Sequence, residues 1–242
     1  MRINSPVINV YKKNNIKSEV VTQLLYGDTF KKIKKTGVWI KIKNDSDNYK
    51  GFIKKNFFST KQKNTHKVYN LSAKLYSKPN TIIKKKLSFG SKIRVSQKKN
   101  NFYKFDNLWI KKKNLKKINY KTKDVFKNIK KFINTKYKWG GKHYSGVDCS
   151  ALIQLFINFN NKFCPRDTKD QIKYFKKKIE LNKIRKNDLI FWNGHVAVAI
   201  SKLNLIHAYG PEKKTVIMPI KKTIDRIYKT TNLKVVAIRR ID

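Results

Sequence analysis

The chain has 242 residues and a formal charge of +45, because 59 lysines and arginines face only 14 aspartates and glutamates. Hydrophobic residues make up 40% of it, enough to bury real cores, which excludes a disordered polyelectrolyte. Its two cysteines, Cys149 and Cys164, are too few for a disulfide framework.

The positive charge does not by itself indicate a nucleic-acid site. Of the 59 basic residues, 52 are lysine and 7 arginine, and 31 of the 59 precede residue 121. Base and phosphate recognition favours the arginine fork and a clustered footprint. We therefore attribute the charge to drift in composition on solvated surfaces, and we expect no specific nucleic-acid partner, only non-specific attraction to polyanions at low salt.

We expect neither a secretory signal at the N-terminus nor a membrane-spanning helix. The first residues, MRINSPVINVYKKNN, lack an apolar core, and no apolar run approaches the ~18 residues of a membrane span. We expect a cytoplasmic protein without a membrane span, with export by another route as the alternative. The sequence leaves the oligomeric state open.

Residues 1–120 are predicted to be all-β. Short strand-like runs such as VVTQLLYGDTFKKI and GVWIKI are separated by turn residues, and a fainter copy, including KLSFGSKIRVSQ and NFYKFDNLWIKKKNL, follows. This internal repeat predicts two small antiparallel barrels, over residues 1–62 and 63–120. The alternative is an unrelated β-rich half.

Residues 121–242 are predicted to form an α+β domain. Helical spacing favours helices over 124–134 and 149–159 and a short one within 167–178. Five strand-like runs follow, from NDLIFWN to VVAIRRI. Helices that precede a run of strands indicate helices packed on an antiparallel sheet.

Cys149 begins the second helix, directly after Gly146-Val147-Asp148. A helix N-terminus offers partial positive charge and free N–H groups, which favour a thiolate. We therefore expect a lowered thiol pKa and a nucleophile here. The alternative is a small buried residue, which is common for cysteine.

Two histidines strengthen the case for catalysis. A turn centred on Ser201 would place His195 and His207 opposite each other, about 5 Å apart, with Ala197 and Ala199 on the same face as room for the Cys149 helix. The order is then nucleophile, base and orienting residue. Zinc is the competing reading, but no close ligand pair exists, so we expect no metal and no cofactor.

Six short motifs occur in order along the last 120 residues. They are Tyr137-x-Trp139-Gly140-Gly141, Gly146-x-Asp148-Cys149-Ser150, Pro165-Arg166-Asp167-Thr168-x-x-Gln171, Asp188-Leu189-Ile190-Phe191, His195-Val196 and Ile206-His207-Ala208. This string resembles the NlpC-type (NlpC/p-sixty) cell-wall peptidases, a papain-like family. The front half resembles the bacterial SH3-like domains that precede such catalytic domains. Ala151 departs from the glycine usual at that position.

The resemblance implies a fold and a set of catalytic residues. It implies a papain-like cysteine peptidase domain over 121–242 after two SH3-like barrels, 1–62 and 63–120. Cys149 would be the nucleophile, His195 the base and His207 the third member. Tyr137 would help to stabilise the oxyanion.

The resemblance also implies substrate-binding residues. Asp148 and Ser150 would receive a free N-terminal amine, Arg166 and Thr168 would hold the α-carboxylate of D-glutamate, and Glu19 and Tyr49 would close the amine end. The plain alternatives are a helix cap for Asp148 and a surface ion pair for Arg166. We expect no role for His143.

The expected reaction is hydrolysis of peptidoglycan-derived stem peptides between γ-D-glutamate and a diamino acid, in murein peptide recycling. The alternatives are an exported endopeptidase that acts on intact murein, and a non-catalytic protein that binds a polyanion or the wall. The sequence does not identify the diamino acid, nor whether a free N-terminal L-alanine is required.

Overall fold

A computed structural model of the chain describes residues 1–55 and 58–241. The chain divides into two compact units. Unit 1 holds Met1–Lys121 together with Lys142–Tyr144, and unit 2 holds Thr122–Gly141 together with Ser145–Asp242. The predicted division of unit 1 at residue 62, into two separately folding domains, stays a prediction.

Unit 1 is built from short strands, as the turn-rich sequence predicts. Its elements are β1 (Arg2–Ile3), β2 (Val7–Tyr11), β3 (Val20–Leu25), β4 (Phe30–Thr36), β5 (Trp39–Asn44), β6 (Lys50–Lys54), β7 (Phe58–Ser59), β8 (His66–Val68), β9 (Ser72–Lys78), β10 (Thr81–Ser88), β11 (Lys92–Ile93), β12 (Gln97–Lys99), β13 (Phe102–Phe105), β14 (Leu108–Lys111), the 3₁₀ turn η1 (Lys112–Asn114), β15 (Leu115–Lys117) and β16 (Lys142–His143).

The internal repeat predicted from the sequence is visible in the strand order. One sheet runs β3-β2-β6-β5-β4 and the other β10-β9-β14-β13-β12, so both place their five strands in the order 2-1-5-4-3. All these neighbours pair antiparallel. Among the described residues the pairing does not return from the last strand to the first, so neither sheet is closed into the predicted barrel.

Two ion pairs link the first 62 residues of unit 1 to the residues that follow them. Arg2 forms an ion pair with Asp106 at 3.0 Å, and the side chain of Arg2 is 4% exposed. Asp28 forms another with Lys92 at 3.2 Å. Burial acts to raise the pKa of Asp28, but the charge of Lys92 and of the other nearby cations outweighs it, so the pKa lies below its ordinary value.

Lys142–Tyr144 belongs to unit 1 although the residues on either side belong to unit 2. The backbone N–H of Lys142 donates to Oε1 of Gln23 at 2.9 Å, and that of Tyr144 donates to Oγ of Ser88 at 3.0 Å. Gln23 lies on β3 and Ser88 on β10, so both sheets hold this segment.

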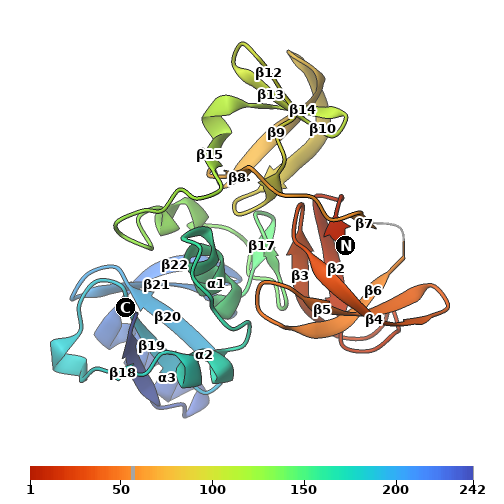
Figure 1. The fold of residues 1–242 in the computed structure, drawn as a ribbon. Helices are drawn as coiled ribbons and strands as arrows, with labels where there is room; N and C mark the ends of the chain where they lie inside the picture. Colours follow the sequence, from red (N-terminus) through yellow and green to blue (C-terminus); the bar gives the residue numbers. More distant parts are fainter. Residues whose placement is uncertain (56–57, 242) are drawn as a thin grey trace. The chain divides into compact units, whose positions relative to one another are not determined.

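Unit 2 contains the longer helices and a six-stranded sheet. Its elements are η2 (Ile129–Phe132), β17 (Gly146–Val147), α1 (Cys149–Phe159), α2 (Thr168–Tyr174), β18 (Lys177–Lys178), η3 (Leu181–Lys183), β19 (Asp188–Trp192), β20 (His195–Ala199), β21 (Asn204–Tyr209), β22 (Lys214–Pro219), α3 (Ile220–Thr231) and β23 (Ala237–Arg240). The sheet runs β18-β23-β19-β20-β21-β22, drawn mostly in blue in Figure 1. The expectation of helices followed by an antiparallel sheet holds for α1 and α2, whereas α3, between β22 and β23, was not expected.

Helices α1 and α3 both pack on this sheet. Ala197 and Ala199 lie in one cluster with Ile220 and Ile227 of α3. Helix α1 contacts β20 and β21. The expectation that Ala197 and Ala199 make room for the Cys149 helix stays a prediction.

The prediction of a helix over 124–134 is also wrong. Only the 3₁₀ turn Ile129–Phe132 forms there. Phe126, Ile129 and Phe132 are all buried, and a spacing of three suits the tighter 3.0-residue turn. Asn134 follows in the left-handed conformation, with φ +64°. Among the described residues, no helix is both long and apolar enough to cross a membrane.

Candidate active site

Cys149 is the first residue of α1, as the sequence predicts. Asp148 caps the helix, because its Oδ1 accepts the backbone N–H of Ala151 at 2.8 Å. All but one of the eleven residues of α1 are buried, so the helix is held on most sides. Cys149 itself is 5% exposed.

The thiol of Cys149 does not have the lowered pKa expected from its place on the helix. Burial first, and the carboxylate of Asp148 second, raise the pKa to about 12. The backbone N–H groups of Val196 and Ser150 and the charge of Arg166 act in the opposite direction but do not offset burial. The sulfur is therefore a protonated thiol at neutral pH, which corrects the expectation of a resting thiolate.

His195 and His207 meet, although not by the register expected. Val198 pairs with Ile206 and Ala199 with Leu205, so continuing the ladder places His207 opposite Ala197. The turn is centred on Lys202, one residue later than expected, with Ile200 donating to the carbonyl of Asn204. This moves the partner of His207 by two residues, from His195 to Ala197. The two histidines still share a face, and Nε2 of His195 lies 2.9 Å from Nδ1 of His207.

Both rings are neutral at physiological pH. Burial lowers the pKa of His195 to about 4. Burial also lowers the pKa of His207 well below its ordinary value, and the nearby His195 and Arg226 act in the same direction. No carboxylate is bonded to either ring among the described residues. The pair can therefore accept a proton, because at least one nitrogen of a neutral ring carries a lone pair.

Met218 is a contact of this site that the sequence analysis missed. Its Sδ lies 3.5 Å from Nε2 of His207. Tyr209 stacks on the other side of the histidine, with ring centroids 4.5 Å apart and planes 10° apart. Nothing in the sequence singles out Met218, since it reads as one more apolar residue of the run TVIMPI.

Asp148, Ser150 and Arg166 form one buried cluster. Arg166 donates to both carboxylate oxygens of Asp148 and to Oγ of Ser150, the last at 2.8 Å. The side chains of Arg166 and Asp148 are 2% and 7% exposed. Asp148 thus serves as the helix cap, and the ion pair of Arg166 is buried rather than at the surface. Their predicted roles as substrate ligands stay predictions.

Burial is the main cause that raises the pKa of the Tyr137 hydroxyl, and the sulfur of Cys149 is the next. Tyr137 therefore lies near Cys149. Thr168 is the first residue of α2, next to the helix-starting Asp167. Glu19 and Tyr49 belong to unit 1, where Glu19 pairs with Lys12 at 3.1 Å. The structure gives no contact that tests the roles of these four residues.

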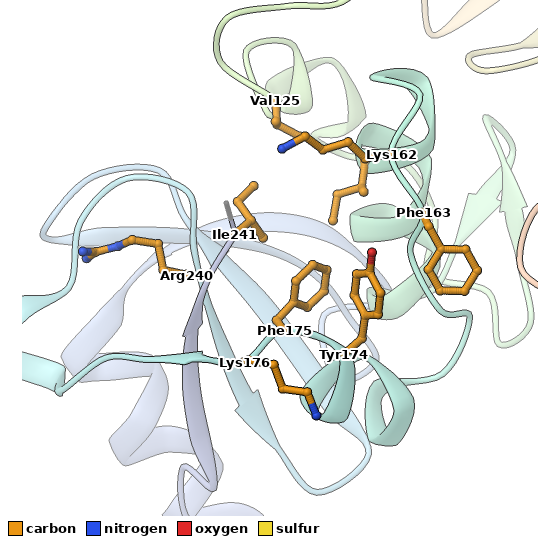
Figure 2. A pocket seen from close by; sticks show the side chains of 9 residues that line it. Val125, Lys162, Phe163, Tyr174, Phe175, Lys176, Arg240 and Ile241 are labelled. Atoms are coloured by element: carbon orange, nitrogen blue, oxygen red, sulfur yellow. The ribbon is translucent and has the colours of Figure 1, made fainter.

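A separate cavity of about 320 Å³ lies elsewhere in unit 2 (Figure 2). Tyr174, Phe175 and Ile241 surround it, whereas the guanidinium of Arg240 points away. That guanidinium is held by Asp188 at 2.8 Å. No candidate site residue lines this cavity, so it is not the candidate active site.

Comparison with protein-family models matches two segments of the chain. Residues 134–234 match the model of the NlpC/P60 family, and residues 6–59 match a bacterial SH3 domain. Residues 134–234 are an NlpC/P60 family domain. The cysteine that starts α1 and the histidine pair on β20 and β21 all lie within this domain, and the resemblance noted in the sequence is confirmed.

Two curated relatives match part of the chain. Dipeptidyl-peptidase 6 of Lysinibacillus sphaericus is 33% identical over 85 residues, which is 35% of this chain and 31% of that protein. A probable endopeptidase NlpC homolog of Haemophilus influenzae is 32% identical over 102 residues, 40% of this chain and 54% of that protein. The matched regions thus span about a third and about half the length of these relatives.

Solved structures share the fold more widely. An NlpC/P60 family protein from Bacillus cereus superposes with a TM-score of 0.81, covering 99% of this chain and 98% of that one at 18% identity. An NlpC/P60 endopeptidase from Photobacterium damselae subsp. piscicida gives 0.64 at 14% identity, covering 98% of this chain and 70% of that one. At these identities the likeness shows the fold alone.

Proposed function

We propose that the protein is a cysteine peptidase that hydrolyses peptidoglycan-derived stem peptides at the bond between γ-D-glutamate and a diamino acid. One observation carries the proposal. The half-buried His195 opens β20 and lies 2.9 Å from the buried His207 of β21, and Val196, the residue after His195, directs its N–H toward the sulfur of Cys149. A thiol, a base and a residue that orients the base are the parts that acyl transfer needs.

In the first step the sulfur of Cys149 attacks the carbonyl carbon while its proton moves to His195. Because the thiol is protonated at rest, proton transfer accompanies S–C bond formation rather than preceding it. The imidazolium then gives the proton to the leaving amine as the C–N bond breaks, and a thioester remains. His207 supports the imidazolium through its ring nitrogen.

In the second step water attacks the thioester. His195 removes a proton from the water, the C–S bond breaks, and the sulfur leaves with a proton returned from His195. The raised pKa of Tyr137 keeps its hydroxyl protonated, so that it can donate to the oxyanion in both steps. A donor of this kind contributes about 3–4 kcal/mol to the transition state.

The substrate class rests on the relatives and on the polar cluster beside Cys149. The relatives' names describe a dipeptidyl-peptidase and an endopeptidase. Asp148 and Arg166 place a carboxylate and a guanidinium side by side, which is complementary to a substrate end that carries an ammonium and a carboxylate. A nucleophile helix ahead of an antiparallel sheet supports the papain-like assignment. We propose recycling of released murein peptides in the cytoplasm.

The test is to incubate L-Ala-γ-D-Glu-diaminopimelate with the protein and detect the L-Ala-D-Glu dipeptide. The N-acetylated peptide is run beside it. Recycling of released peptides predicts that only the free amine is cleaved efficiently, whereas an exported endopeptidase would cleave both. Absence of dipeptide from both substrates, with a folded protein, would reject the proposed activity.

A further inference from the structure

The nitrogen of His207 that does not face His195 has a thioether as its partner. Nε2 of His207 lies 3.5 Å from Sδ of Met218, and His207 is only 1% exposed. A thioether sulfur carries lone pairs but no hydrogen, so it can accept a hydrogen bond and never donate one. A hydrogen bond at this contact therefore requires the proton of His207 to be on Nε2.

The proton on Nε2 of His207 decides which nitrogen of His195 carries a proton. A neutral imidazole carries one N–H, so Nδ1 of His207 is then a lone pair. It accepts from Nε2 of His195, 2.9 Å away. Nε2 of His195 thus holds the single proton of that ring, and its Nδ1 is left unprotonated. Only this tautomer leaves His195 able to take a proton from a thiol on the side away from His207.

The surroundings keep the rings neutral, which makes the choice of tautomer matter. Burial lowers the pKa of both histidines. Arg226 of α3 is the charged group that acts on His207, and it is itself paired with Glu212 at 2.7 Å. A charged ring would be protonated on both nitrogens, and then no acceptor could select between them.

We propose that Met218 is a positioning residue, which accepts a hydrogen bond from His207 and so selects the tautomer in which Nδ1 of His195 is unprotonated. In the opposite tautomer Nδ1 of His207 would donate to Nε2 of His195, and the proton of His195 would block transfer from the thiol. The catalytic consequence rests on the proposed function, whereas the ring tautomers do not.

The tautomers are measured directly by long-range ¹H–¹⁵N spectra of the histidine rings at pH 7.5. The wild type is expected to show His195 and His207 with the proton on Nε2. Met218→Leu keeps the packing volume but removes the acceptor, so a mixture of tautomers is expected. Ile217→Leu, next to it on β22, is the matched control and leaves the spectra unchanged. A proton on Nδ1 in the wild type, or unchanged spectra in Met218→Leu, would overturn the inference.

Kinetics then separate positioning from packing. Met218→Leu is expected to lower kcat on the order of threefold to tenfold, the range for one modest hydrogen bond, with KM within about twofold. In a His207→Asn background the amide oxygen can accept from His195 without Met218, so adding Met218→Leu is expected to leave kcat unchanged. An equal loss of kcat in both backgrounds would show a packing role and reject the inference.

The two proposals fail in different ways. If the wild type cleaves no stem peptide but the rings carry their protons on Nε2 and respond to Met218→Leu, the proposed function is rejected and the role of Met218 stands. If the wild type is an active peptidase whose rings carry their protons on Nδ1, the role of Met218 is rejected and the peptidase stands.

Discussion

Two polar groups of unit 2 are held in opposite charge states. The pair His195–His207 is neutral, and the charge of Arg226 further disfavours protonation of His207. At the start of α1, by contrast, Asp148 and Arg166 form an ion pair whose two side chains are 7% and 2% exposed. Burial disfavours charge in both places, so the difference lies in whether an opposite charge is within reach.

The comparison explains the state of Cys149. After burial, the carboxylate of Asp148 is the next cause that raises the pKa of the thiol. Arg166 lowers that pKa but is also bonded to Asp148, and it does not outweigh burial, so the sulfur keeps its proton. For the proposed reaction this means that the proton must move at the moment of attack, between neutral partners.

The largest effect is expected at the nucleophile. Cys149→Ala should lower kcat/KM for the stem peptide by at least about a thousandfold, because no other group can form the thioester. Cys164→Ala, whose cysteine is also buried, should retain activity within about threefold. Equal activity of the two variants would remove Cys149 from the mechanism.

The free energy of unfolding tests the buried ion pair between Asp148 and Arg166. Arg166→Leu leaves the carboxylate of Asp148 buried without its partner, so the free energy of unfolding should fall by about 3–5 kcal/mol in urea denaturation. Adding Asp148→Asn should restore a large part of the loss. Lys12→Leu breaks the exposed pair Lys12–Glu19, with side chains 64% and 38% exposed, and should change stability by less than about 1 kcal/mol.

The pH dependence of kcat/KM tests whether the histidine pair is neutral. A base with a pKa of about 4 stays unprotonated as the pH falls, so kcat/KM should hold from pH 7 to about 5 and drop only near 4. A histidine with the ordinary pKa would already have lost about 30-fold at pH 5. An acid limb near 6.5 would contradict the neutral pair.

The lowered pKa of His195 also predicts how the free energy of unfolding depends on pH. The folded pKa lies below the unfolded value of about 6.5, so the unfolded chain takes up protons first. Stability should therefore fall as the pH decreases from 6.5 toward 4. The slope should be smaller in His195→Gln, measured by urea denaturation at each pH, and an unchanged slope would contradict the assignment.

The smallest effect concerns the thiol itself. Asp148→Asn keeps a capping side chain but removes the carboxylate that raises the pKa of Cys149, so that pKa should fall by about one unit and alkylation at pH 9 should speed up about tenfold. Cys164 serves as an internal control in the same peptide map and should react more slowly in both proteins, because it is 0% exposed. No change at Cys149 would show that burial alone sets its pKa.

Local chemistry made much of this site predictable. Gly146-Val147-Asp148-Cys149 before an apolar run indicated a capped, buried helix, and α1 begins and ends where the pattern places it. The two histidines were assigned to neighbouring strands because period-two alternation is short-ranged and robust. The match of five strands in each half of unit 1 was also indicated by the repeated turn residues.

What failed depended on the tertiary environment. The sign of the pKa shift at Cys149 follows from burial, which no local pattern reveals. The helix expected over 124–134 gave way to a 3₁₀ turn because three aromatic and aliphatic side chains reach one core. The contact of Met218 with His207 depends on the register between β21 and β22, where His207 lies opposite Val216.

Lys142–Tyr144 has a practical consequence for anyone who divides this protein. Its backbone donors end on Gln23 and Ser88, two side chains from the first 121 residues. A fragment that starts at Thr122 would carry these three residues without those acceptors, a few positions ahead of the cysteine. In such a fragment the loop before Cys149 would lack two of its hydrogen-bond acceptors, so low turnover of the fragment would say little about the activity of the intact chain.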